Sequence, residues 1–201
     1  KGCRKLLKRV IARANAPMYI TIDTAHQVGQ HMFIKPTIRD IEVMQLKKTP
    51  RISYLPLEIQ DLIFKKENPK QIYSMLDKYD YWFAEPEDCD VYQWFSQLGC
   101  YSPIVHLQQT DGRYSEHRPF TEQYNKNGII KPQKVFTAIK ASYDQDEEAG
   151  MPPRVDDIYL AFEVFFSVMD SKEKIINDLR ESVKYWREAL PRDGIRLNEL
   201  V

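Results

Sequence analysis

The stretch from Ser102 to His117, S-P-I-V-H-L-Q-Q-T-D-G-R-Y-S-E-H, decides how the rest of the sequence is interpreted. Its apolar start, residues 103–105, predicts a buried strand, and His106 is the first polar side chain after this run. The Asp-Gly pair at 111–112 predicts a turn. Ligands of α/β proteins bind beyond the carboxyl ends of parallel strands, so we interpret this strand end as a candidate site. A core histidine bonded to a backbone carbonyl explains His106 alone equally well.

Two other predicted strands carry a carboxylate near the same end. The run 18–23, M-Y-I-T-I-D, is rich in β-branched residues and ends at Asp23. The run 157–166, D-I-Y-L-A-F-E-V-F-F, encloses Glu163 among apolar side chains. A buried glutamate is costly unless it is paired or bound to a metal. An ion pair with a lysine or arginine is the alternative explanation of Glu163.

Amphipathic helices are predicted around these strands, at residues 2–14, 85–99, 131–143 and 171–190. Such alternation of strands and helices is typical of an α/β protein with a parallel sheet. Three strands are too few to close a barrel, and the sequence opens within a helical pattern. We therefore expect residues 1–201 to be the C-terminal part of one (β/α)8 TIM-barrel domain, which needs about 250 residues.

Residues 27–81 interrupt this alternation. They hold helical patterns at 38–46, 57–64 and 71–79, separated by prolines and without a clear strand. We interpret this region as a helical insertion over the same end of the sheet as Asp23. Insertions of this length are usually functional, and a lid is expected.

The composition excludes some classes of protein. The 201 residues contain 29 basic and 29 acidic side chains, which argues against a nucleic-acid partner. No apolar run approaches the roughly 20 residues needed to span a bilayer, so no membrane partner is expected. Three cysteines without metal-binding spacing indicate reduced thiols and a cytoplasmic location.

The three strand-end side chains, Asp23, His106 and Glu163, form a set of oxygen and nitrogen donors. Such a set suits Mn²⁺, Mg²⁺, Co²⁺ or Zn²⁺ and disfavours soft, thiolate-binding ions. We expect one divalent metal ion there, with Mn²⁺ as the first choice.

Four further side chains are candidates for substrate binding. His26 lies three residues past Asp23, and Gln109 and Arg113 lie in the loop after the His106 strand. Arg113 and Arg118 are suited to an anionic group such as a phosphate. The alternatives are a surface histidine and solvated loop charges.

The motifs D-T-A-H (23–26), V-H-L-Q-Q-T-D-G (105–112) and Y-L-A-F-E-V (159–164) resemble the xylose isomerase-like TIM-barrel superfamily of sugar isomerases and epimerases. Within it, the sequence is most similar to the ketose and ketose-phosphate 3-epimerases. The H-L-Q-Q-T-D-G stretch resembles the tetrulose-phosphate branch, of the D-erythrulose 1-phosphate 3-epimerase type.

The resemblance implies a ligand set of Glu, Asp, His and Glu for one divalent ion. Asp23, His106 and Glu163 would be the second, third and fourth ligands, and the first glutamate would precede residue 1. It also implies that His26 and an arginine hold substrate oxygens. Arg113 fits that position only approximately, because its spacing from the metal histidine differs by a residue.

The implied activity is metal-dependent epimerisation of a carbon next to a ketone, through a metal-bound enediolate. Glu163 would be one of two acid–base groups, the substrate a small sugar or sugar phosphate, and the assembly a homo-oligomer. An aldose–ketose isomerase and a non-catalytic sugar-binding relative are rival interpretations. An endonuclease IV-like metal phosphodiesterase is a third, against which the four histidines and zero net charge argue.

Overall fold

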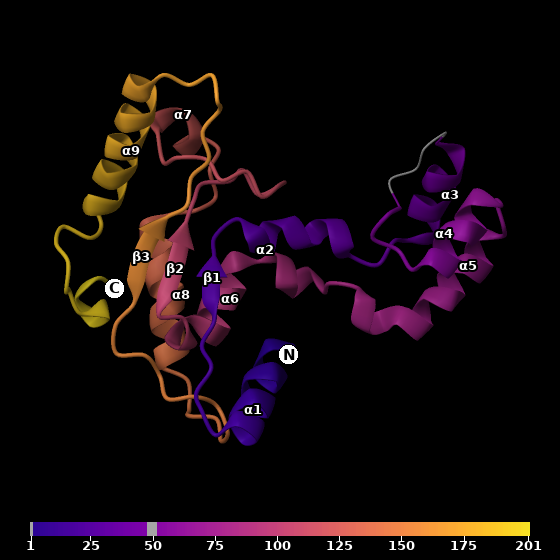
Figure 1. The fold of residues 1–201 in the computed structure, drawn as a ribbon, viewed down its shortest axis with the longest axis horizontal. Coiled ribbons are helices and arrows are strands. Elements are labelled where there is room, and N and C mark those ends of the chain that lie inside the picture. Colours follow the sequence, from indigo (N-terminus) through magenta and orange to yellow (C-terminus); the bar gives the residue numbers. More distant parts are fainter. Residues whose placement is uncertain (1, 48–51) are drawn as a thin grey trace. The chain divides into compact units, whose positions relative to one another are not determined.

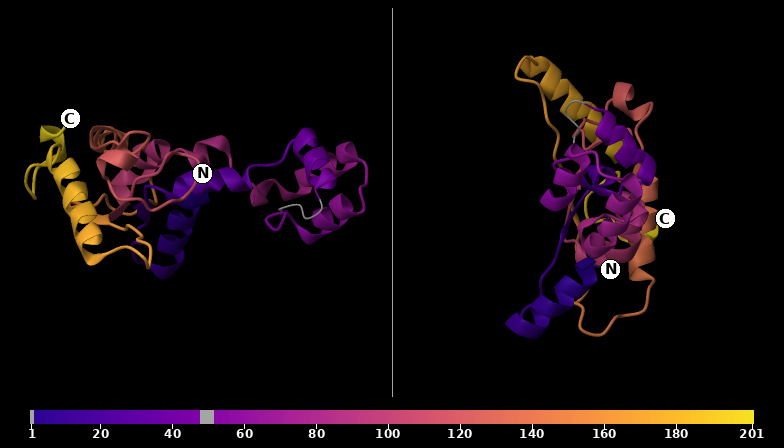
Figure 2. Two further views of the ribbon diagram at one scale, coloured as in Figure 1. Left: turned by 90° about the horizontal axis from the view of Figure 1, so that it is seen from above. Right: turned by 90° about the vertical axis from the view of Figure 1, so that its right-hand side faces the viewer.

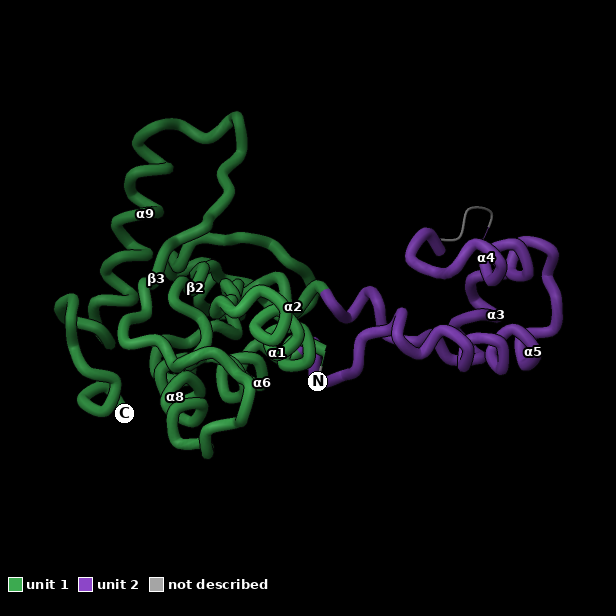
Figure 3. Tube along the Cα trace, turned by 60° about the horizontal axis from the view of Figure 1, so that its bottom comes forward, with its two compact units in different colours: residues 1–29, 90–201 green, residues 30–89 purple. Residues whose placement is uncertain are grey.

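The computed structural model describes residues 2–47 and 52–201. The chain divides into two compact units (Figure 3). The first comprises residues 1–29 and 90–201, and the second comprises residues 30–89. Residues 48–51 of the predicted insertion lie outside the described residues.

The first unit is a mixed α/β structure around a three-stranded sheet. Its strands are β1 (Thr21–Asp23), β2 (Ile104–Leu107) and β3 (Tyr159–Phe162). Its helices are α1 (Gly2–Ala14), α2 (His26–Gly29), α6 (Val91–Leu98), η4 (Gly99–Tyr101), α7 (Glu122–Asn125), α8 (Pro132–Tyr143), α9 (Lys172–Arg187) and η5 (Leu197–Glu199). The strands are parallel in the order β1-β2-β3, as expected. An eight-stranded barrel would need further strands and stays a prediction.

The carboxyl ends of the strands lie at one edge of the sheet. In Figure 1 the three arrows point the same way, and residues 108–121 and 163–171 run on from their tips. This arrangement is the one the sequence predicts for a site formed by successive strand ends.

Helices cover one face of the sheet. Ile22, Val105 and Leu107 are buried on that face, in one core with Phe95 of α6 and Val135 of α8. The core also takes in Trp186, in the last turn of α9, the helix on the outer side of this unit (Figure 2). On the other face the strand starts are open, whereas Asp23 at the carboxyl end of β1 is buried.

The opposite face of the sheet carries exposed residues at the strand starts. Ile104 is 41% exposed and Tyr159 is 67% exposed. Parallel sheets are normally covered on both faces. In the described part of this unit the face toward α6 and α8 is packed along the strands, whereas the opposite face is open at the strand starts and buried at Asp23, at the carboxyl end of β1.

Several predicted boundaries are wrong, among them those of α6 and β3. The helix predicted from residue 85 begins at Val91, because the Asp90 carboxylate caps it by accepting the Tyr92 N–H at 2.8 Å. Residues 86–89 form a separate 3₁₀ turn, η3 (Pro86–Cys89). The third strand ends at Phe162, so Glu163 follows the strand, and its side chain is 33% exposed instead of fully buried. An apolar run in the sequence does not mark the end of a strand, because a strand ends where its backbone pairing with the neighbouring strand ends.

The second unit is helical and has its own core. Its elements are η1 (Gln30–Phe33), α3 (Ile38–Leu46), α4 (Leu57–Phe64), α5 (Pro69–Met75), η2 (Leu76–Trp82) and η3. Ile41, Ile59, Ile63 and Leu76 are among its buried residues. α3 and α4 have the predicted bounds, and the unit spans 30–89 beside the predicted 27–81. Its function as a lid stays a prediction.

Among the described residues, no helix combines the length and apolar character needed to cross a membrane.

Gly128 packs against the amide group of Gln109 so closely that no other residue fits. A Cβ at Gly128 would lie 2.2 Å from Gln109 Cδ. We expect Gly128→Ala to lower the free energy of unfolding by about 1–3 kcal/mol, as measured by denaturant titration, because the amide has fixed partners and cannot move aside cheaply. Gly2→Ala is the control, since no atom lies within 4 Å of that site. Equal stability of the two variants would contradict this packing.

Two partly buried phenols, of Tyr92 and Tyr143, predict a loss of stability at alkaline pH. Burial raises the pKa of Tyr92 and of Tyr143 to about 12. The unfolded phenols ionise near pH 10, so their contribution is complete below pH 10 and is lost as the pH rises toward 12. We expect the melting temperature to fall across this interval, and less steeply in a Tyr92→Phe, Tyr143→Phe double variant. Parallel curves for the two proteins would refute this assignment.

Candidate metal centre

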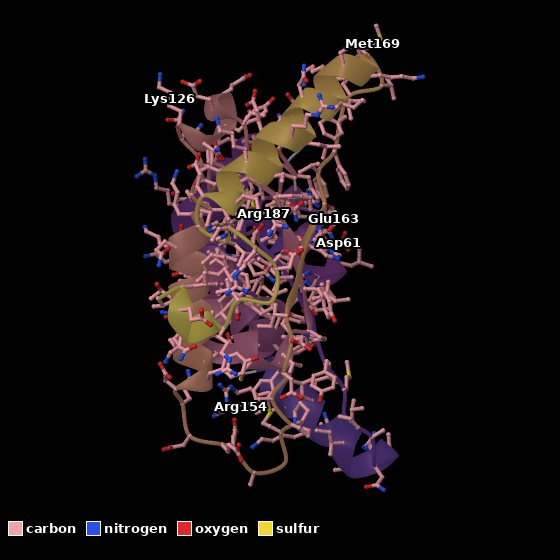
Figure 4. All side chains as sticks on the ribbon, turned by 90° about the vertical axis from the view of Figure 1, so that its left-hand side faces the viewer. Asp61, Lys126, Arg154, Glu163, Met169 and Arg187 are labelled. Atoms are coloured by element: carbon pink, nitrogen blue, oxygen red, sulfur yellow. The ribbon has the colours of Figure 1, made fainter. Side chains whose placement is uncertain are left out.

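The register of the sheet brings three candidate metal-binding side chains onto one face. Asp23 lies opposite His106, and His106 lies opposite Ala161. Residue 163 comes two positions after Ala161, and its N–H donates to Leu107 O at 3.1 Å, so the pairing continues past β3. Because side chains alternate along a strand, Asp23, His106 and Glu163 point to the same side. Figure 4 labels Glu163 on the segment that follows β3.

The side chains also meet at their tips. One ligand atom from each of Asp23, His106 and Glu163 lies within 4.8 Å of the other two. His106 Nδ1 is 2.7 Å from Glu163 Oε2 and 3.9 Å from Asp23 Oδ2. These separations suit three donors around one small cation.

The two oxygens of Asp23 have different environments. Oδ1 accepts the backbone N–H groups of Ala25 and His26, each at 2.8 Å. Oδ2 is buried and has no hydrogen-bond partner, and the same holds for Glu163 Oε2. Each of these oxygens lies near an imidazole nitrogen without a hydrogen bond between the two atoms.

These orphaned oxygens fit a bound cation. A buried carboxylate oxygen without a partner is costly, and coordination to a metal removes that cost. Two carboxylates with one imidazole are the donor set of a hard or borderline divalent ion. The described residues therefore fit a divalent metal ion, whose identity this donor set leaves open among Mn²⁺, Mg²⁺, Co²⁺ and Zn²⁺.

His26 lies beside the cluster, at the start of α2. Its Nδ1 is 3.0 Å from Asp23 Oδ2, and its side chain is 57% exposed. An exposed imidazole next to a metal ligand is available to a molecule bound there. Its predicted contact with substrate remains a prediction.

His117 belongs to a second candidate metal-binding group, which shares Asp23 with the first, although the sequence did not single it out. Its ligand atom groups with those of Asp23 and His26 within 4.8 Å. The ring stacks on Phe165, with centroids 4.2 Å apart, and contacts the His26 ring edge-on at 4.8 Å. His117 lies in a loop with a positive φ of 53°, so no hydrophobic period points to it. Its position is set by a long-range bond, in which Phe165 N–H donates to His117 O.

Gln109 is turned away from the cluster. Its amide nitrogen donates to Asn125 Oδ1 and Ile130 O, and its amide oxygen accepts the N–H groups of Thr110 and Ile130. The side chain is thus buried and fully bonded on the helix side of the sheet. Gln109 was expected in an open loop, but the structure buries it and bonds its amide to the surrounding chain.

The two arginines lie in the loop without joining the metal-binding groups. Arg113 is 78% exposed and pairs with Asp111 at 3.3 Å. Arg118 pairs with Glu116 at 3.6 Å and lies over the Tyr124 ring. Their binding of a substrate anion stays a prediction.

No protein-family model matches the chain. A curated relative, the D-erythrulose 1-phosphate 3-epimerase of Brucella abortus (strain 2308), is 28% identical over 119 residues. The match covers 59% of this chain and 35% of the relative, so the chain spans about a third of the protein it matches. The relative is a sugar-phosphate epimerase by name, which is the class of enzyme that the three motifs resemble.

Proposed function

We propose that this chain supplies part of the active site of a divalent-metal-dependent sugar-phosphate epimerase. The observation that carries the proposal is the convergence of Asp23, His106 and Glu163, with a buried, unbonded carboxylate oxygen on each of the two acids. The similarity to a named epimerase supports the same class of reaction. We propose that the complete enzyme has a TIM-barrel fold.

A divalent ion held by these three residues would supply Lewis acidity toward the ketone oxygen of the substrate. Glu163 lies next to that position and is partly exposed, so its carboxylate is able to take a proton from the neighbouring carbon. His26 is placed to hold a substrate oxygen by a hydrogen bond. Inversion needs a second acid–base group on the other face, for which we propose the glutamate expected before residue 1.

The proposed substrate is a four-carbon ketose phosphate, with D-erythrulose 1-phosphate as the first candidate. The relative's name supports this choice. Arg113 and Arg118 are the proposed partners of the phosphate group. A homo-oligomer in the cytoplasm, without nucleic-acid or membrane partners, completes the proposal.

Product analysis in deuterated water tests the reaction. The full-length protein with Mn²⁺ is incubated with D-erythrulose 1-phosphate, and the products are followed by NMR. An epimerase introduces deuterium at the inverted carbon and leaves the ketone in place. Parallel incubations with D-erythrulose 4-phosphate, whose C1 hydroxyl is free, and with a phosphodiester test the rival reactions. Formation of an aldose phosphate from the first would assign the isomerase reaction instead, and cleavage of the second without action on either ketose phosphate would assign the nuclease class.

A further inference from the structure

Gln108 directly follows β2 and is completely buried, yet its amide group has no partner. Neither Gln108 Oε1 nor Nε2 makes a hydrogen bond. Its backbone, in contrast, is fixed at both ends. Thr24 Oγ1 accepts the Gln108 N–H at 2.9 Å and donates to Gln108 O at 2.8 Å.

The alternation of side chains along β2 assigns the Gln108 amide to the face of the sheet that carries the candidate metal-binding groups. Leu107 and Gln109 are on the helix side of the sheet, where Leu107 is part of the core and Gln109 bonds to Ile130. Since side chains alternate, Gln108 between them points to the other side, together with His106. The unpartnered amide is therefore on the same face as the metal-binding groups.

An unbonded buried amide is unfavourable, because folding removes its water without replacing it. Such a group is expected to have a ligand or an ordered water as its partner. A primary amide offers two N–H donors and a carbonyl acceptor side by side. Neighbouring oxygens of a hydroxyketone, one accepting and one donating, match this pattern, whereas a phosphate dianion only accepts.

We propose that Gln108 binds the substrate by its hydroxylated carbon skeleton, holding two neighbouring oxygens beside the metal centre. The inference deepens the proposed function and rests on it. It assigns the amide to the neutral part of a sugar, not to its phosphate. Gln108 is a binding and positioning residue, and moves no proton.

Adjacent glutamines provide a matched test. In Gln108→Met the unbonded amide is replaced by an apolar side chain of similar size, so the melting temperature of the ligand-free protein is expected to hold or rise. In Gln109→Met four hydrogen bonds are lost, and the melting temperature is expected to fall. Opposite effects at two neighbouring positions would not arise if both side chains were structural.

Kinetics supply the second measurement. With D-erythrulose 1-phosphate and Mn²⁺, Gln108→Met is expected to raise KM roughly tenfold with a smaller change in kcat, because the bond holds the substrate before and during reaction. Gln108→Glu keeps a hydrogen-bond acceptor but loses the two N–H donors. Its KM is expected to lie between those of the wild-type protein and Gln108→Met. Unchanged KM, or a stability loss in Gln108→Met equal to that of Gln109→Met, would overturn the inference.

Failure of the proposed function has a separate signature. If the wild-type protein leaves D-erythrulose 1-phosphate unchanged, the epimerase proposal fails. The role of Gln108 is then judged with D-erythrulose and erythritol as probes in thermal shift. A shift in the wild-type protein that disappears in Gln108→Met supports the contact, and no shift with either probe overturns it.

Discussion

Replacing Glu163 with glutamine is expected to lower kcat by about 10²–10⁴-fold while the protein remains folded. The amide has the same shape as the carboxylate but cannot accept the proton. The side chain is 33% exposed and follows β3, so the core is untouched. Turnover of D-erythrulose 1-phosphate, in the full-length protein with Mn²⁺, measures the effect.

A matched substitution checks that charge alone is not responsible. Glu147 is exposed on the same unit, and Glu147→Gln is expected to leave kcat unchanged. Circular dichroism and the melting temperature establish that both variants fold. A Glu163→Gln variant with wild-type turnover would remove Glu163 from the reaction.

Adding Mn²⁺ is expected to raise the melting temperature, and EDTA to reverse the rise. A ligand at a hundredfold excess over its dissociation constant stabilises the folded state by about 2.7 kcal/mol. Asp23→Asn is expected to abolish most of this shift, because an amide nitrogen cannot replace the Oδ2 ligand. Its remaining oxygen still accepts the N–H groups of Ala25 and His26, so the local turn is retained.

Asp146→Asn is the control for this experiment, since Asp146 is exposed and lies in the same unit. Metal content after dialysis gives an independent reading of binding. A full Mn²⁺-dependent shift in Asp23→Asn would show that the ion binds elsewhere. Loss of the shift in both variants would point to a general charge effect.

Local sequence signals were sufficient to predict the positions of several helices. α1 has the predicted bounds and α8 begins one residue after its predicted start, because apolar spacing and flanking residues such as Pro132 act within a few residues. The meeting of Asp23, His106 and Glu163 also follows from the sequence, since parallel strands bring their carboxyl ends together. Their binding of a metal stays a prediction.

The parts that could not be predicted depend on tertiary structure. On the sequence alone, Gln109, and not Gln108, was a candidate for substrate binding. Only the alternation of side chains along β2 indicates which of the two glutamines is on the face of the candidate metal centre. His117 was missed because stacking on Phe165 and a bond from its backbone place it, and neither leaves a periodic pattern. Glu163 was expected inside a strand, since an apolar run does not mark where pairing stops.

The different environments of the two Asp23 oxygens have a consequence for the ion selectivity of the proposed metal site. Two backbone amides hold one oxygen and thereby prevent the group from rotating, so the other oxygen is already aimed before any ion arrives. Little conformational entropy remains to be lost on coordination. We expect a carboxylate fixed in this way to discriminate between ions by their radius, because it cannot rotate to adjust its distance to a larger or smaller ion.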